Sequence, residues 1–181
     1  AEGQVWYNTT SGTFKTVLSV GAWSSGGNVN TARRYVFGAG TQTASLLVNG
    51  YSTGFSNASE EYNGSSWTSV TNAPFSVYNS AGGGIQTAAF LTGGDLGTAI
   101  NQVTGEYNGS SWAASDPLNP GRSKLAGNGT QNDALAVGGE SPTTSATEEY
   151  NGTAWSNGGS LITARYSQTG VGASTNAAIV F

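Results

Sequence analysis

The sequence predicts an all-β protein that folds as a four-bladed β-propeller, with its last blade closed by N-terminal strands. One octapeptide recurs, as EEYNGSSW at 60–67, GEYNGSSW at 105–112 and EEYNGTAW at 148–155. A glycine-rich motif recurs in step with it, at 38–50, 82–94, 127–139 and 170–181. Between these motifs, Val, Tyr, Phe and Trp come in short runs separated by Gly, Ser, Thr and Asn, which is typical of short strands joined by tight turns.

The spacing of the repeat sets the size of one structural unit. Tyr62, Tyr107 and Tyr150 are 45 and 43 residues apart, and the Trp that follows each Tyr keeps the same intervals. Fixed-period similarity of about this length is typical of propeller blades, which have four strands each. We therefore predict a single domain over residues 1–181, with units at about 24–67, 68–112, 113–155 and 156–181, the last completed by residues 1–23.

Each unit is expected to contain four strands in a fixed order. The first follows the TAR-like stretch, and the second is the apolar run after Gln-Thr-Ala, which ends at Gly-Gly or Asn-Gly. The third leads into Tyr-Asn-Gly, and the fourth contains the Trp. Because Asn-Gly favours positive φ, it suits a tight hairpin between the third and fourth strands.

The two ends of the sequence complement each other. The fourth unit reaches Phe181 after its second strand, whereas the N-terminus starts with a hairpin pattern, QVWYN, TTSG and TFKTVL. Trp23 also precedes Arg33 by the ten residues that separate Trp155 from Arg165. N-terminal strands that complete the last blade would remove open sheet edges. The alternative is that these residues are a piece of a longer array.

Composition excludes several classes of function. The 181 residues include no Cys, His or Met, so we expect no disulfide, no transition-metal site and no cofactor. Charged residues make up 9% of the chain and the net charge is −4, which does not suit a nucleic-acid partner. No apolar run is long enough for membrane insertion.

The repeated Tyr and Trp residues have two interpretations, a ring of sugar-stacking platforms or packing between blades. Packing is favoured because a residue present in every unit usually serves every unit, and Tyr7 fits the same role. The paired carboxylates Glu60–Glu61 and Glu148–Glu149 are strand neighbours, so their side chains should point to opposite faces. We therefore do not expect them to act together as acid and base.

The candidate binding residues are cations and aromatics that precede the first strand of a unit. Arg33, Arg122 and Arg165 recur at equivalent positions, and Arg34, Tyr35, Lys124 and Tyr166 lie nearby. If they gather at one end of the ring, they would bind an acidic sugar or the carboxylates of a partner. Alternatively, each Arg ties one blade to the next through backbone carbonyls. Both interpretations remain open from the sequence.

The motifs resemble a known type of protein. The Gly-Gly after an apolar strand and the later Trp resemble kelch repeats, and NTARRYVFGAGTQTA with EEYNGSSW is similar to kelch-like arrays of marine bacteriophage proteins. The start AEGQVWYNTTSGTFK resembles a segment of phage tail-fibre and virion structural proteins, matched at Gly3 to Gly12 and at Lys15.

The resemblance implies a non-enzymatic adhesion or structural module on the virion surface, such as a fibre, spike or capsid-decoration domain. The expected partners are a host cell-surface glycan, other virion proteins and further copies of the chain. One alternative is a sialidase-like or other carbohydrate-active enzyme, with Tyr35 or Tyr166 as nucleophile beside Arg33, Arg122 and Arg165. A second alternative is an intracellular kelch-type scaffold for protein interactions.

Overall fold

The protein is all-β. The computed structural model describes residues 5–16 and 24–181, which form sixteen strands in five antiparallel sheets. Sheet I contains β3 (Phe37–Thr41), β4 (Ala44–Val48), β5 (Ser59–Tyr62) and β6 (Trp67–Val70). Sheet II contains β7 (Ala81–Ile85), β8 (Ala88–Thr92), β9 (Thr104–Tyr107) and β10 (Trp112–Ser115). In the described part of the chain, no helix is long and apolar enough to cross a membrane.

The remaining strands form three further sheets. Sheet III contains β11 (Ala126–Thr130), β12 (Asp133–Val137), β13 (Thr147–Tyr150) and β14 (Trp155–Asn157). Sheet IV contains only β15 (Gly170–Ser174) and β16 (Ala177–Val180). A separate N-terminal hairpin consists of β1 (Val5–Asn8) and β2 (Thr13–Thr16).

The predicted strand order is confirmed in sheets I, II and III. In each sheet the four strands pair in chain order, and the Tyr that ends the third strand pairs with the Trp that begins the fourth. The Asn of each hairpin accepts hydrogen bonds from the two backbone N–H groups that follow its glycine, as Asn63 does from Ser65 and Ser66 at 3.0 Å. The glycine itself has a positive φ, 91° at Gly64, so Asn-Gly acts as the predicted turn.

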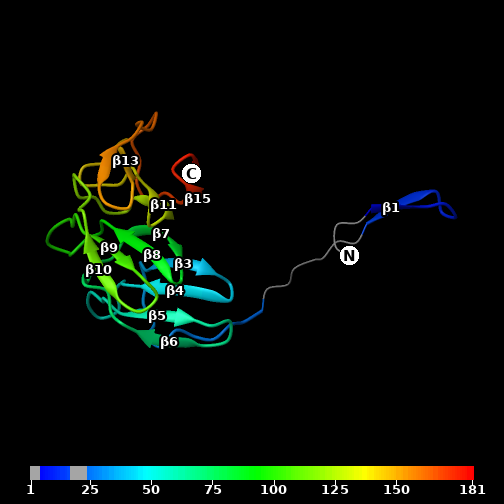
Figure 1. Ribbon diagram of the computed structural model, residues 1–181, viewed down its shortest axis with the longest axis horizontal. Coiled ribbons are helices and arrows are strands. Elements are labelled where there is room, and N and C mark those ends of the chain that lie inside the picture. Colours follow the sequence, from blue (N-terminus) through cyan, green and yellow to red (C-terminus); the bar gives the residue numbers. More distant parts are fainter. Residues whose placement is uncertain (1–4, 17–23) are drawn as a thin grey trace.

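Sheets I to IV follow one another around a common centre (Figure 1). The first strand of each repeat unit contacts the first strand of the next, β3 with β7, β7 with β11 and β11 with β15. All four of these inner strands line one hollow of about 440 Å³. This arrangement is consistent with a β-propeller-like fold.

The hydrophobic core lies between the faces of neighbouring sheets. Phe37, Leu46 and Val48 of sheet I form one buried cluster with Ala89, Leu91 and Tyr107 of sheet II. Phe90 of sheet II forms another with Ala134 and Tyr150 of sheet III. Two glutamines strengthen these contacts, because Gln86 and Gln131 each donate two hydrogen bonds to backbone carbonyls of the preceding sheet.

The repeated Tyr and Trp residues pack as predicted. Each Tyr–Trp pair has ring centroids 4.9 to 5.0 Å apart, and Tyr107 and Tyr150 are 0% and 1% exposed. Tyr7 does not share this role in the structure, because 53% of it is exposed.

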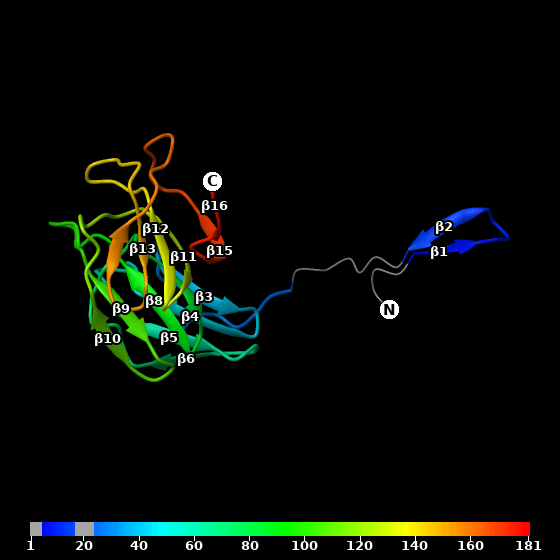
Figure 2. The ribbon, with the colours of Figure 1, turned by 45° about the horizontal axis from the view of Figure 1, so that its top comes forward.

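The described residues do not establish the predicted closure of the last blade. Among them, β15 pairs with β16, and β1 pairs with β2 to form the predicted N-terminal hairpin. Figure 2 shows that hairpin as a separate element. The hairpin satisfies the hydrogen bonds between its own two strands, so it needs no partner to form its turn. Trp23, on which the predicted register depends, lies outside the described residues.

Tyrosine hydroxyls connect the sheets through carboxylates. Tyr107 Oη donates to Glu61 at 2.9 Å, and Tyr150 Oη donates to Glu106 at 2.6 Å. Burial, reinforced by the carboxylate of Glu106, raises the pKa of Tyr150 to about 12, and burial with Glu61 raises the pKa of Tyr107. The folded state therefore favours the protonated phenols of both residues.

These shifts predict a loss of stability at alkaline pH. A phenol whose pKa is raised in the folded state contributes stability that is fully present below its unfolded pKa of about 10 and is lost as the pH rises through the folded pKa. We expect the free energy of unfolding, from urea titrations, to fall between pH 10 and pH 12, by about 1–2 kcal/mol for Tyr150 alone. Tyr150→Phe should reduce this fall, whereas Tyr166→Phe, at a half-exposed position, should not. Equal slopes for wild type and Tyr150→Phe would contradict the assignment.

Candidate functional site

One end of the sheets carries a repeated rim of backbone bridges. The residue after the recurrent Arg position pairs antiparallel with a residue beyond the second strand, and these pairs are Arg34–Tyr51, Tyr78–Asp95 and Ser123–Glu140. Backbone hydrogen bonds of 2.9 to 3.4 Å hold each pair in both directions. These bonds therefore fix the backbone at six residues, in three equivalent pairs.

The next residue of each unit is held in a left-handed conformation. Tyr35, Asn79, Lys124 and Ser167 have φ of 57°, 55°, 51° and 56°. Backbone hydrogen bonds join them in sequence, from Asn79 N to Tyr35 O, Lys124 N to Asn79 O and Ser167 N to Lys124 O, at 2.8 to 3.4 Å. Non-glycine residues in this region cost about 1–3 kcal/mol each and occur preferentially at binding sites. Here they direct different side chains to the same end of neighbouring units.

The rim and the left-handed residues together form a hollow of about 440 Å³, which we call the aromatic–basic hollow. Its lining residues are Arg34, Tyr35, Tyr51, Phe55, Tyr78, Asn79, Asp95 and Lys124. They come from units one, two and three, so the hollow exists only because neighbouring sheets are packed together. Its size is within the range of small-ligand sites.

Four aromatic rings form a connected wall of this hollow. Tyr78 lies at the centre, stacked on Phe55 with ring centroids 5.4 Å apart and 15° between the planes. Tyr51 is edge-on to Phe55 at 5.5 Å and to Tyr78 at 6.2 Å, and Tyr35 is tilted against Tyr78 at 5.8 Å. Because Tyr35 and Phe55 are 53% and 43% exposed, the wall offers apolar surface to a ligand.

Two cations face this wall, and they differ in how they are paired. The Arg34 guanidinium lies 5.4 Å from the Tyr35 ring centroid and 5.0 Å from that of Tyr51. Among the residues that the structure describes, its guanidinium has no hydrogen-bonding or ionic partner. Lys124 Nζ, in contrast, forms an ion pair with Glu140 at 2.7 Å. Arg34 is therefore the cation of the hollow with unused donors.

The polar groups opposite Arg34 are already engaged with one another. Tyr78 Oη donates to Asp95 Oδ2 at 3.1 Å, and Gly97 N donates to Asp95 Oδ1 at 2.6 Å. Burial and the Asp95 carboxylate raise the pKa of Tyr78, so its hydroxyl stays protonated at neutral pH. The hydrogen bond to Glu140 raises the pKa of Lys124, which stays charged. The hollow therefore presents a fixed pattern of charge.

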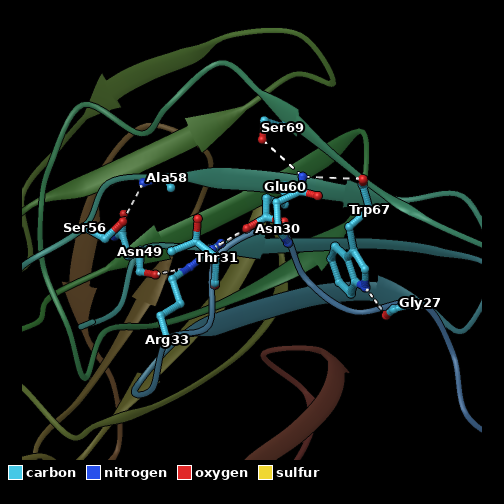
Figure 3. A network of polar contacts seen from close by, with 10 residues as sticks. All are labelled: Gly27, Asn30, Thr31, Arg33, Asn49, Ser56, Ala58, Glu60, Trp67 and Ser69. Carbon is cyan, nitrogen blue, oxygen red and sulfur yellow. Dashed lines mark hydrogen bonds and ion pairs between the residues drawn. The ribbon is translucent and has the colours of Figure 1, made fainter. Parts of the chain in front are cut away.

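Arg33 and Arg122 do not reach this hollow, because they form buried ion pairs inside the sheets. Figure 3 shows Arg33 against Glu60, and its Nε donates to Asn49 O at 2.9 Å. Arg122 Nη1 lies 2.5 Å from Glu148, and its Nε donates to Gly138 O at 2.8 Å. Both Arg side chains are at most 1% exposed. Of the two interpretations of the recurrent Arg, the structure supports the stabilising one at these two positions.

The same network also holds the segment that precedes sheet I, at Gly27 and Asn30, against the strands of that sheet. Asn30 N donates to Glu60 Oε2 at 2.7 Å, and the indole of Trp67 donates to Gly27 O at 3.0 Å (Figure 3). In sheet III, Asn119 N donates to Glu148 in the equivalent way, at 3.2 Å. The Glu60–Glu61 pair does point to opposite faces, since Glu60 binds Arg33 while Glu61 accepts the Tyr107 hydroxyl. Both carboxylates of this pair thus stabilise the fold.

The other predicted residues are divided between the hollow and its surroundings. Arg34, Tyr35 and Lys124 line the hollow. Tyr166 is 50% exposed and lies beneath Lys124 Nζ, which is 5.6 Å from its ring centroid. Arg165 is exposed, and its Nε donates to Thr163 O at 3.5 Å.

Sequence reasoning missed five residues of the hollow, Tyr51, Phe55, Tyr78, Asn79 and Asp95. Tyr51, Phe55 and Asp95 follow the second strand of a unit, in stretches that lie outside the repeated motifs. Tyr78 stands at the position of Arg34 in the next unit. Comparison of the units position by position would have grouped Arg34 with Tyr78, but no pattern in the sequence identifies their partners across the rim.

The described residues contain no cluster of three or more His, Cys, Asp or Glu side chains that would hold a metal ion. The geometry places an aromatic wall beside a guanidinium that has no partner among the described residues, an arrangement suited to binding. The sequence matches no protein-family model, and no curated protein is similar to it.

Proposed function

We propose that this protein is a non-enzymatic recognition module of a virion surface, and that the aromatic–basic hollow binds an anionic host glycan. The observation that carries the proposal is the Arg34 guanidinium, which has no partner among residues 5–16 and 24–181 and is held over two rings at a hollow of about 440 Å³. Sugar rings stack on exposed aromatic faces such as those of Tyr35 and Phe55, and a guanidinium binds a carboxylate or sulfate in bidentate fashion. An acidic surface of another virion protein would also offer carboxylates to this guanidinium, and is the other partner expected for the hollow.

The non-enzymatic part of the proposal rests on where the acidic and basic residues are. Glu60 and Glu148 are held in buried ion pairs, and Glu61 and Glu106 accept tyrosine hydroxyls between sheets. A sialidase-like site would need a cluster of accessible Arg side chains, but Arg33 and Arg122 are buried. The assignment to a virion is supported by the resemblance of residues 1–15 to phage structural proteins and of the repeats to kelch-like arrays.

A glycan array tests the recognition half of this proposal. The purified chain, displayed as a multivalent conjugate to compensate for weak single contacts, should bind sialylated, uronic-acid or sulfated glycans above their neutral counterparts. Silence across the array would favour a virion-protein partner or a purely structural role. Mass spectrometry of purified particles tests the virion half, and absence of the protein from them would contradict it.

We further propose that the units form a closed four-bladed ring, in which N-terminal strands complete sheet IV. Three of the four expected unit-to-unit hydrogen bonds at the left-handed positions are present, and sheet IV has two strands where the others have four. Removal of residues 1–16 should then lower the unfolding temperature and expose the edge of β16. An unchanged unfolding temperature would show that residues 1–16 are not the missing strands.

A further inference from the structure

Sheet III carries a carboxylate that lacks the partner its equivalents have in sheets I and II. Glu61 of sheet I accepts the hydroxyl of Tyr107 from sheet II. Glu106 of sheet II accepts the hydroxyl of Tyr150 from sheet III. Glu149 of β13 stands at the same position, directly before the Tyr of its sheet, but it is exposed, and its carboxylate accepts no hydrogen bond from the residues that the structure describes. The series of contacts therefore ends at sheet III with an acceptor left over.

This carboxylate belongs to the side of sheet III on which sheet IV lies. Glu149 pairs with Leu135 of β12, in the register that Glu61 has with Leu46. Because side chains alternate along a strand, equal positions in equal registers point to the same side of a sheet. In sheets I and II this side receives the Tyr hydroxyl of the next sheet. In sheet III the next sheet is sheet IV, whose β15 contacts β11.

Sheet IV has a free position for the tyrosine that would complete the series. In sheets I to III, the Tyr of the third strand pairs with a second-strand residue that itself pairs with a Gly of the first strand. These sets are Gly40–Ser45–Tyr62, Gly84–Ala89–Tyr107 and Gly129–Ala134–Tyr150. In sheet IV, Gly172 pairs with Ala178, and within residues 24–181 no strand pairs with the other edge of β16. A Tyr opposite Ala178 would stand in the equivalent position.

The N-terminal hairpin has a tyrosine in the required pattern. Tyr7 of β1 pairs with Phe14 of β2, an aromatic pair like that of Tyr62 with Trp67, and each Tyr is followed by Asn. Tyr7 is 53% exposed, and Ile179 on the edge strand β16 is 65% exposed. A strand laid along β16 would therefore remove apolar surface from water and also pair the open edge.

We propose that Glu149 is the docking point of the N-terminal hairpin, where β1 pairs with β16, Tyr7 lies opposite Ala178, and the Tyr7 hydroxyl donates to the Glu149 carboxylate. The contact rests on the proposed closure of the ring, to which it adds the partner residue and the register. A hydrogen bond to a carboxylate is stronger than one between neutral groups. A slip of one residue would turn Tyr7 to the opposite face of the sheet, so the contact selects one register.

Disulfide cross-linking of the full chain tests this register, because the chain contains no Cys. With Tyr7 opposite Ala178, Val5 lies opposite Val180, so Val5→Cys with Val180→Cys should form a disulfide in a glutathione buffer. Val5→Cys with Ala178→Cys is the matched control, out of register by about 7 Å along the strand, and its disulfide should be at least about tenfold less favoured. Non-reducing electrophoresis should show a cross-linked monomer. A disulfide-linked dimer would mean that the hairpin docks on a second copy, which would overturn the contact within one chain.

Glu149→Ala in the background of Val5→Cys with Val180→Cys tests the docking point itself. The equilibrium constant for the disulfide should fall about tenfold, as expected for loss of a hydrogen bond to a charged group, and Tyr7→Phe should give a similar fall. The two changes together should cost little more than either alone. Tyr166→Phe removes a hydroxyl from a half-exposed ring outside β15 and β16 and should have no effect.

The outcomes separate this contact from the closure on which it rests. Absence of the cross-link in both registers would contradict the closure and the contact together. A cross-link that forms in the expected register and is unchanged by Glu149→Ala would leave the closure standing and overturn the role of Glu149. A preference for the control register would likewise overturn the contact, because Tyr7 would then not lie opposite Ala178.

Discussion

Replacing Arg122 by Val lowers the free energy of unfolding by about 3–5 kcal/mol, because it leaves Glu148 buried without its counter-charge. Glu148 is 3% exposed in its side chain, and Arg122 donates to it at 2.5 Å. Without Arg122, the Glu148 carboxylate still has the free-energy cost of removal from water, but it no longer has the attraction to a counter-charge that offsets this cost. For a chain of 181 residues we expect the unfolding temperature to fall by roughly 6–20 °C.

Unit two of the same chain supplies the matched control. Val77 stands ten residues after Trp67, where Arg122 stands ten after Trp112, and Gly105 stands two residues before Tyr107, where Glu148 stands before Tyr150. Val77 is fully buried, and Phe75 packs beside Gly105. Sheet II thus forms without the ion pair.

The double variant Arg122→Val with Glu148→Gly should therefore be more stable than Arg122→Val alone, although it removes more atoms. Urea unfolding of the wild type, both single variants and the double variant measures the coupling free energy. A double variant that loses the sum of the two single effects would mean that the ion pair does not stabilise sheet III as a unit.

The repeat made the strands predictable, but it did not distinguish two adjacent arginines. The alignment of the repeats on Tyr62, Tyr107 and Tyr150 predicted which residues pair in each hairpin, and the Asn-Gly dipeptides predicted the turns. Both predictions were possible because hairpins depend on local backbone geometry. Arg33 and Arg34 are neighbours on the chain, yet one is buried against Glu60 and the other faces the aromatic wall. Whether each Arg side chain is buried or faces the hollow depends on how neighbouring sheets pack against each other, which a local sequence pattern does not describe.

The sequence does contain a signal for the buried role. Arg and Glu occur together in units one and three, as Arg33 with Glu60 and Arg122 with Glu148, and are both replaced in unit two. Such joint variation between repeats is what a pair in contact produces. The aromatic–basic hollow has no such signal, because Tyr51 and Phe55 occur in one unit only and reach Tyr78 across a sheet boundary.

Arg34 should dominate recognition of an anionic glycan. Replacing Arg34 by Ala removes a guanidinium whose donors have no partner among the described residues, and hydrogen bonds to charged groups contribute about 1.5–3 kcal/mol each. We therefore expect the dissociation constant for an acidic glycan that binds on the array to rise about 10- to 100-fold, measured by isothermal titration calorimetry. Because the side chain is exposed, the unfolding temperature should change little.

Arg165→Ala is the matched control, since it removes the same charge from an exposed position that does not line the hollow. It should leave affinity unchanged at physiological ionic strength, where long-range effects of surface charge are screened. Arg34→Lys keeps the charge but loses the planar fork, so it should recover only part of the affinity. Equal losses for Arg34→Ala and Arg165→Ala would show that binding follows net charge, and the aromatic–basic hollow would then not be the site.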